Sequence, residues 1–289
     1  MIASPILVIG ALGNVGAELV KRLQAEGRVV RAADLNADQI RARFGGSVEA
    51  VRFDFADPST YPDAFSGVER MFLLRPPQIT DVQSLMLPAI QTARRAGVRH
   101  AVFLSLIGIE RNTQVPHYQV ELALKANHFE TTFLRCSFFM QNLTTVHRRE
   151  IAERDEIFVP VGRARTSFID VRDIAAVAAR ALTEQGHANQ NYDLTGGEAL
   201  DYWQAADILT ETLGRRITYR NPHPAHFFFE TVRRGTPLMF AYVQTRLYVS
   251  TRNGMANGVT PDVERLTGRK PISFRQFAED YKECWQSAQ

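Results

Sequence analysis

The 289-residue sequence has only two cysteines, Cys136 and Cys284, and they lie far apart in the chain. A disulfide framework and a cysteine metal site are therefore not expected, and we predict no bound metal. The sequence also lacks any apolar run of the roughly 18 residues that a membrane-spanning helix needs. The apolar residues 6–9 have no basic segment before them and lead into glycines, which indicates a strand and a turn rather than a signal peptide. We expect a cytoplasmic protein that binds no membrane.

Lysine is also scarce. Four lysines (Lys21, Lys125, Lys270 and Lys282) stand beside 30 arginines, and the formal net charge is only +3. The basic residues are scattered along the chain, so no basic patch of the kind that binds nucleic acid is expected. The scarcity matters for chemistry, because many reductases use a catalytic lysine and few candidates exist here.

The residues that are present favour an α/β fold. The first two thirds of the chain alternates short β-branched runs with helical patterns, which is typical of a parallel sheet built from βαβ units. The predicted strands are residues 6–10, 29–34, 50–54, 70–74, 101–106 and 131–136. The clearest helix begins after Asp81 and ends at Gly97. Capping patterns at 170–173 and 201–204 predict two later helices, and the apolar, aromatic-rich region from about 222 to 255 predicts a helical lobe.

Residues 10–16 read Gly-Ala-Leu-Gly-Asn-Val-Gly, between the first predicted strand and a helix. Glycines in such a turn allow close backbone approach, so that amide N–H groups and the helix N-terminus can meet a pyrophosphate. The spacing therefore predicts dinucleotide binding, and a purely structural turn is the alternative. The candidate binding residues are Gly10, Leu12, Gly13, Asn14, Val15 and Gly16.

Two carboxylates follow the next strands. Asp34 ends the second predicted strand, where it can accept hydrogen bonds from both ribose hydroxyls and repel a 2′-phosphate. This favours NAD(H) over NADP(H), although Arg31 or loop groups can compensate. Asp54 and Phe55 end the third strand, where a carboxylate and a flat ring would suit an adenine edge; a turn before Asp57 is the alternative.

Several further segments, taken together with the glycine motif and Asp54, form a pattern that is typical of one protein family. They are Phe-Leu-Leu-Arg-Pro at 72–76, Phe-Leu-Arg at 133–135, Phe-Met-Gln-Asn at 139–142, and the segments 168–174, 260–264 and 267–269. Together they resemble the NmrA-like family, which comprises atypical relatives of the short-chain dehydrogenases. The resemblance covers essentially the whole chain.

The resemblance implies a Rossmann-type doubly wound parallel sheet with a small, mostly helical C-terminal substrate lobe, all within one unit over residues 1–289. The dinucleotide-binding core would take residues 1–155 and parts of 165–200, and the lobe about 200–289. It also implies NAD(P) binding along the strand ends, with the nicotinamide near Ser105 and the turn at 136–139. The further cofactor candidates are Leu74, Arg75, Pro76, Ser105 and Phe138.

The sequence lacks the Tyr-x-x-x-Lys pair of short-chain dehydrogenases. The residues four before the lysines are Ala17, Glu121, Leu266 and Ala278. The stretch from His117 to Glu121 instead resembles the His-x-x-x-Glu form of some quinone- and dye-reducing relatives. Because they are four residues apart, these two would share a helix face; His117 would donate a proton, and Glu121 would orient His117. Tyr118 is a second acid candidate, and a surface or capping role for His117 is the alternative.

These features predict an NAD(P)H-dependent reductase of a quinone-like or conjugated aromatic acceptor. Such an acceptor takes hydride with little help from a positioned acid, and the 18 phenylalanines suit a flat apolar pocket. The alternative is a non-catalytic NAD(P)-sensing regulator of the NmrA type that acts on a partner protein. A homodimer is compatible with either hypothesis.

Overall fold

The computed structural model describes residues 4–286, and the chain divides into two units. The first unit takes the residues up to Cys136 and Val171–Leu194, and the second takes Ser137–Asp170 and the residues from Thr195 onward. Residues 137–155, which the sequence assigned to the dinucleotide-binding core, therefore lie in the second unit. The difference arises because the chain leaves the sheet of the first unit at Cys136 and returns only with the helix that begins at Val171.

The first unit is built on a seven-stranded parallel sheet in the order β3-β2-β1-β4-β5-β6-β8. The strands are β1 (Ile6–Ile9), β2 (Val30–Asp34), β3 (Glu49–Arg52), β4 (Arg70–Leu73), β5 (His100–Leu106), β6 (Glu130–Cys136) and β8 (Gln190–Leu194). The six predicted strands and the Rossmann-type class are confirmed. The seventh strand, β8, is not predicted by the sequence, because its polar Gln-Asn-Tyr-Asp-Leu lacks the β-branched run that marks the others.

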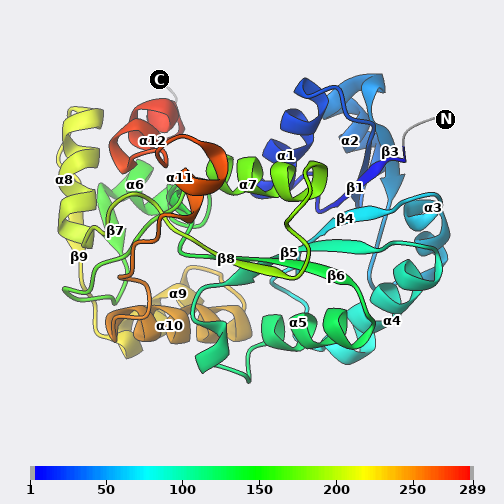
Figure 1. Cartoon of the computed structure of the whole chain (residues 1–289). Helices are drawn as coiled ribbons and strands as arrows, with labels where there is room; N and C mark the ends of the chain where they lie inside the picture. The colour runs from blue at the N-terminus through cyan, green and yellow to red at the C-terminus, as the bar shows by residue number, and fades with distance from the viewer. Residues whose placement is uncertain (1–3, 287–289) are drawn as a thin grey trace. The chain divides into compact units, whose positions relative to one another are not determined.

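Helices cover both faces of this sheet. Figure 1 shows α1 and α7 on one face and α4 and α5 on the other. The helices of the unit are α1 (Asn14–Ala25), α2 (Ala37–Phe44), α3 (Tyr61–Phe65), α4 (Val82–Arg95), α5 (Pro116–Ala126) and α7 (Val171–Thr183), with short 3₁₀ turns at Gly45–Ser47, Pro58–Thr60 and Ile109–Arg111. The predicted helix after Asp81 is α4, and the Asp81 side chain accepts a hydrogen bond from the Ser84 N–H (3.0 Å).

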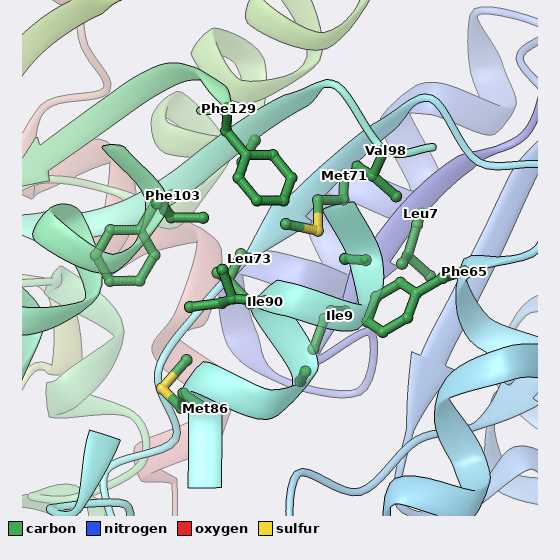
Figure 2. Packing of buried hydrophobic residues seen from close by; sticks show 14 of the residues in the cluster. Leu7, Ile9, Phe65, Met71, Leu73, Met86, Ile90, Val98, Phe103 and Phe129 are labelled. Carbon is green, nitrogen blue, oxygen red and sulfur yellow. The ribbon is translucent and has the colours of Figure 1, made fainter. Parts of the chain in front are cut away.

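One core cluster of the first unit lies between the sheet and α4. Figure 2 shows Leu7 and Ile9 of β1 and Met71 and Leu73 of β4 packed with Met86 and Ile90 of α4 and with Phe65, Val98, Phe103 and Phe129. All of these side chains are buried. Burial of each large side chain stabilises the fold by roughly 1.5–3 kcal/mol, which fixes the strand ends from which the site residues project.

The second unit is mostly helical. It contains a two-stranded parallel sheet, β7 (Glu156–Phe158) and β9 (Thr218–Arg220), with helices α6 (Arg148–Arg154), α8 (Tyr202–Leu213), α9 (Pro224–Arg233), α10 (Leu238–Arg252), α11 (Asp262–Thr267) and α12 (Phe274–Tyr281), and 3₁₀ turns at Met140–Leu143 and Lys282–Trp285. Both the predicted capping box of Asp201 and the helical nature of the 222–255 region are confirmed. No helix among the described residues is long and apolar enough to cross a membrane.

Candidate functional site

The turn between β1 and α1 has a backbone that only glycine can form. Gly10 has φ +78°, and its N–H donates to the Ala33 carbonyl of β2 (2.9 Å). A Cβ atom at Gly16 would lie 2.0 Å from the Gly10 oxygen, and one at Gly10 would lie 2.5 Å from a methyl carbon of Leu74. The glycines thus bring helix, strand and turn into direct backbone contact.

The N-terminus of α1 is suited to an anion. Gly13 is its N-cap and supplies no side-chain acceptor, so the first N–H groups of this 12-residue helix keep their donor capacity. Gly13 and Asn14 are exposed at this end, whereas Val15 and Gly16 are buried against the sheet. The turn can therefore cradle a pyrophosphate, with Leu12, Gly13 and Asn14 as its accessible part.

Asp34 lies beside this turn. Its Oδ2 accepts a hydrogen bond from the Leu12 N–H (2.9 Å), and its Oδ1 accepts one from the Leu35 N–H (2.8 Å). The Leu12 carbonyl in turn accepts from Nη1 of Arg43 on α2 (2.9 Å). A carboxylate and a guanidinium thus flank one residue of the glycine turn. The sequence analysis missed Arg43, because only the fold brings it back over the turn.

At the end of β3 the two candidates have different surroundings. Asp54 is half-buried, and its Oδ1 accepts from the Ala56 N–H (2.9 Å). The Phe55 ring is buried edge-on against Phe53 (4.9 Å between centroids). The ring therefore belongs to the core of the first unit, and its contact with an adenine edge stays a prediction. Asp54 lies at the end of β3, as predicted, and the hydrogen bond that it accepts from Ala56 also forms the turn before Asp57 that was the alternative role.

Arg75 organises the loop after β4. Its Nη1 donates to the carbonyl oxygens of Pro76 (2.9 Å), Pro77 (3.2 Å) and Ile79 (2.5 Å), and its Nε donates to Nδ1 of His117 (3.4 Å). Burial lowers the pKa of Arg75 to about 10, and the side chain remains a cation at neutral pH. Arg75 therefore holds its own loop and joins it to α5.

His117 is a neutral side chain in this setting. Burial, and then the charge of Arg75, lower its pKa from 6.5 to about 3. Because Nδ1 accepts from Arg75, the assigned tautomer carries its proton on Nε2. His117 can donate a hydrogen bond through Nε2 at neutral pH, but it does so as an imidazole and not as an imidazolium.

Glu121 does not orient His117, contrary to the expected pair. The buried Glu121 carboxylate accepts from the Ser105 hydroxyl (2.6 Å) and from both Nε and Nη2 of Arg135 (3.2 and 2.9 Å). Ser105 and Arg135 are neighbours in register on β5 and β6. The Glu121 carboxylate therefore points toward these two strand ends and is hydrogen-bonded there rather than to His117. Within residues 4–286, the partner of His117 is Arg75. The Ser105–Glu121–Arg135 cluster was not foreseen, although Arg135 stands in the predicted strand.

The remaining candidates are placed as follows. Tyr118 is half-buried in the first turn of α5, and Pro76 lies in the loop held by Arg75. Phe138 belongs to the second unit, where its ring stacks on Tyr248 (6.0 Å). Lys125 points its ammonium over the Phe133 ring (5.2 Å), and Lys21 pairs with Glu18 (2.7 Å). These two first-unit lysines thus have structural partners.

The part of the chain that the structure describes holds no cluster of three or more His, Cys, Asp or Glu side chains arranged for a metal ion. His223 is the N-cap of α9 and accepts from the Ala225 N–H (3.3 Å), and His226 packs edge-on against Phe158. Both histidines thus have structural roles within the second unit.

Comparison with known proteins identifies relatives over nearly the whole chain. The model of the NmrA-like family matches residues 3–247. The NAD(P)H azoreductase of Xenophilus azovorans is 32% identical over 290 residues, which cover 98% of this chain and 100% of that protein.

Solved structures share the fold at lower identity. The NADPH-dependent quinone oxidoreductase QOR2 of Escherichia coli, complexed with NADPH, superposes with a TM-score of 0.86 at 22% identity, covering 96% of this chain and 99% of that one. The triphenylmethane reductase of Citrobacter sp., complexed with NADP(H), gives 0.82 at 23% identity with the same coverage.

Proposed function

The chain belongs to the NmrA-like family, and on that premise we propose that it is an NAD(P)H-dependent reductase of a quinone-like or other conjugated aromatic acceptor. The observation that carries the proposal is the glycine turn at Gly10–Gly16, whose contacts leave no room for a side chain at Gly16. A relative that spans the same length is named as an NAD(P)H azoreductase, which supports a conjugated acceptor.

The residues present fit a dinucleotide. Leu12, Gly13 and Asn14 would hold the pyrophosphate at the N-terminus of α1, and Asp34 would accept hydrogen bonds from ribose hydroxyls. When bound, the reduced nicotinamide supplies hydride to the acceptor. The chain itself contributes orientation, exclusion of water and one hydrogen-bond donor.

The hydrogen-bond donor that we assign to the acceptor is Nε2 of His117. Held by Arg75 through Nδ1, the neutral imidazole can polarise the acceptor through a hydrogen bond but keeps its proton, because loss of that proton would leave an imidazolate; the proton that completes the reduction comes from solvent. A simple ketone needs strong proton donation as its alkoxide develops. A quinone or a cationic dye accepts hydride more readily, so a weak donor suffices. The weakness of this donor therefore favours a quinone-like or dye-like acceptor over a simple ketone.

We propose a preference for NAD(H) over NADP(H). The Asp34 carboxylate lies on the glycine turn and repels a 2′-phosphate, while Arg43 on the same residue of the turn offsets part of that repulsion. Asp34→Asn should therefore improve NADPH affinity relative to NADH by about tenfold, and Arg43→Ala should weaken NADPH more than NADH. Fluorescence titration with each dinucleotide measures both ratios. Tighter NADPH binding by the unaltered protein would refute the preference.

The reductase proposal is tested with a panel of quinones, azo dyes and triphenylmethane dyes, in which oxidation of NADH and NADPH is followed by absorbance. We expect turnover of at least one class, and a fall in kcat of roughly tenfold in His117→Ala, because that variant loses one neutral hydrogen bond to an acceptor that needs little help from an acid. The matched control is Leu122→Ala, which changes an exposed residue of the same helix. Dinucleotide binding without turnover of any acceptor would instead support a regulator that senses the NAD(P) state for a partner protein.

A further inference from the structure

Helix α10 of the second unit carries apolar side chains on two opposite sides. Ala241, Tyr248 and Thr251 are buried within the unit. On the other side, Met239, Tyr242, Val243 and Leu247 recur at spacings of three and four residues and remain exposed. Met239 is 65% exposed and Tyr242 53%. A helix with apolar side chains on two sides is normally covered on both, and the outer side of α10 has no covering partner among the residues of the second unit that the structure describes.

The uncovered area is large. Together with the flanking Leu238 and Phe240, the four outer side chains expose roughly 500 Å² in one protomer, if a fully exposed large side chain presents about 150–200 Å². Such a patch is at the upper end of what monomers expose. Two copies of it would bury roughly 1,000 Å², which is the size at which a specific protein interface becomes stable.

We propose that this surface is the interface of a homodimer in which α10 pairs antiparallel with α10 of a second copy. We call it the α10 face and define it by Met239, Tyr242, Val243, Arg246 and Leu247, with Leu238 and Phe240 at its edges. A two-fold axis near Val243 makes the face self-complementary. Positions equidistant from Val243 oppose each other, so Met239 meets Leu247 of the partner subunit.

Arg246 supports the choice of a second copy as the occupant. It is exposed within the α10 face, residues 238–252 contain no Asp or Glu, and no ion pair of Arg246 is found among residues 4–286. In the antiparallel pair, Arg246 and Tyr242 of the partner subunit lie at heights along the helix axis that differ by about 3 Å, which is two residues at 1.5 Å of rise each. Its guanidinium can then stack on that ring, which gives the cation a partner without any carboxylate.

The position of Arg246 also separates this proposal from binding to a lipid surface. A helix that lies on a membrane places its cations on the polar side or at the border of the apolar side, where they reach the headgroups. Here the cation stands in the middle of the apolar stripe, between Tyr242, Val243 and Leu247. That arrangement suits an aromatic partner across a protein interface.

The first experiment measures the mass of the full chain in solution by light scattering and sedimentation over a roughly hundredfold concentration range. We expect a dimer that dissociates on dilution. Val243→Glu would place two carboxylates at the axis and should raise the dissociation constant at least 100-fold, while Leu122→Glu, an exposed apolar helix position of the first unit, should leave it unchanged. Circular dichroism confirms that each variant is folded.

The second experiment uses the symmetry. A residue on a two-fold axis lies next to its own copy, so Val243→Cys should form an intermolecular disulfide under mild oxidation, whereas Leu122→Cys should not. Tyr242→Ala and Arg246→Ala should each weaken the dimer about tenfold, and the double variant should be little weaker than either single one. A monomer at all concentrations, a dimer that Val243→Glu leaves intact, or a monomer that binds vesicles of anionic phospholipid would each overturn the proposal.

Discussion

At the scale of single residues, Gly16 has almost no room for a side chain. Its Cα hydrogen points at the Gly10 carbonyl oxygen, where a methyl group would come within 2.0 Å. We expect Gly16→Ala to separate α1 from β1, to destabilise the first unit by at least about 1–3 kcal/mol and to abolish dinucleotide binding. Thermal unfolding and nicotinamide fluorescence measure the two effects.

The control for that substitution is Gly46→Ala. A Cβ atom there meets no atom within 4 Å, and Gly46 does not have a positive φ. This variant should bind the dinucleotide as the unaltered protein does. If Gly16→Ala also binds normally, the turn has a different role from the one assigned to it.

The buried pair of Glu121 and Arg135 gives a second prediction at this scale. Their side chains are 3% and 14% exposed, so Arg135→Met would leave a buried carboxylate with only Ser105 as a partner. Removal of one member of such a pair costs about 3–5 kcal/mol.

Replacement of both members tests whether the pair is structural. The double variant Glu121→Gln with Arg135→Met should recover much of the lost free energy of unfolding, as measured with denaturant. If acceptor reduction returns together with stability, Glu121 supports the fold. If stability returns while turnover stays low, the carboxylate has a part in the chemistry.

At the scale of elements, local sequence signals fixed the helix ends. The Asp201 carboxylate accepts from the Gln204 N–H (2.8 Å), and the Gln204 side chain accepts from the Asp201 N–H (3.0 Å), as the pattern at 201–204 predicted. Asp201→Ala should lower the free energy of unfolding of the second unit by about 0.5–2 kcal/mol.

Asp201→Ser is the matched variant, because serine supplies an N-cap acceptor at the same position. It should lose no more than a few tenths of a kcal/mol in denaturant unfolding. Equal losses in the two variants would show that the capping box contributes little to α8.

The same scale explains why the expected dyad failed. The spacing of His117 and Glu121 correctly places both on one helix, α5. Spacing does not say which residues of other elements approach that face. Arg75 comes from the loop after β4 and Arg135 from β6, and each captures one member of the expected pair.

At the scale of the whole molecule, three histidines should make stability depend on pH. Burial lowers the pKa of His100 in the first unit and of His147 in the second from 6.5 to about 4, and it lowers that of His117 in the first unit to about 3. Arg70 and His187 lower the pKa of His100 further, while Glu150 partly opposes the shift of His147. Between these pH values the unfolded chain binds protons that the folded chain does not, so stability is full above pH 6.5 and falls as the pH approaches about 4.

Each histidine contributes up to about 1.4 kcal/mol per pH unit to this slope. Denaturant unfolding at about pH 7 and about pH 5 measures it in a range where most carboxylates remain ionised. His100→Gln should reduce the pH dependence of the first unit, where His117 keeps its own share, and His147→Gln should reduce that of the second. An unchanged slope in both variants would show that these histidines are not the groups that titrate.

The sequence by itself determined the parallel sheet, six of its seven strands, the helix caps, the glycine turn and the family resemblance. These depend on periodicity, on backbone conformations that only glycine allows, and on hydrogen bonds between residues a few positions apart, so they can be read locally.

Only the tertiary structure decided which side chains meet. It brought Arg43 onto the glycine turn, Arg75 to His117 and Arg135 to Glu121, it buried the Phe55 ring, and it assigned residues 137–155 to the second unit. Such contacts join residues that are distant in the chain. A buried charge or hydrogen-bonding group takes whichever partner the packing of strands and helices brings within reach, and no local pattern carries that information.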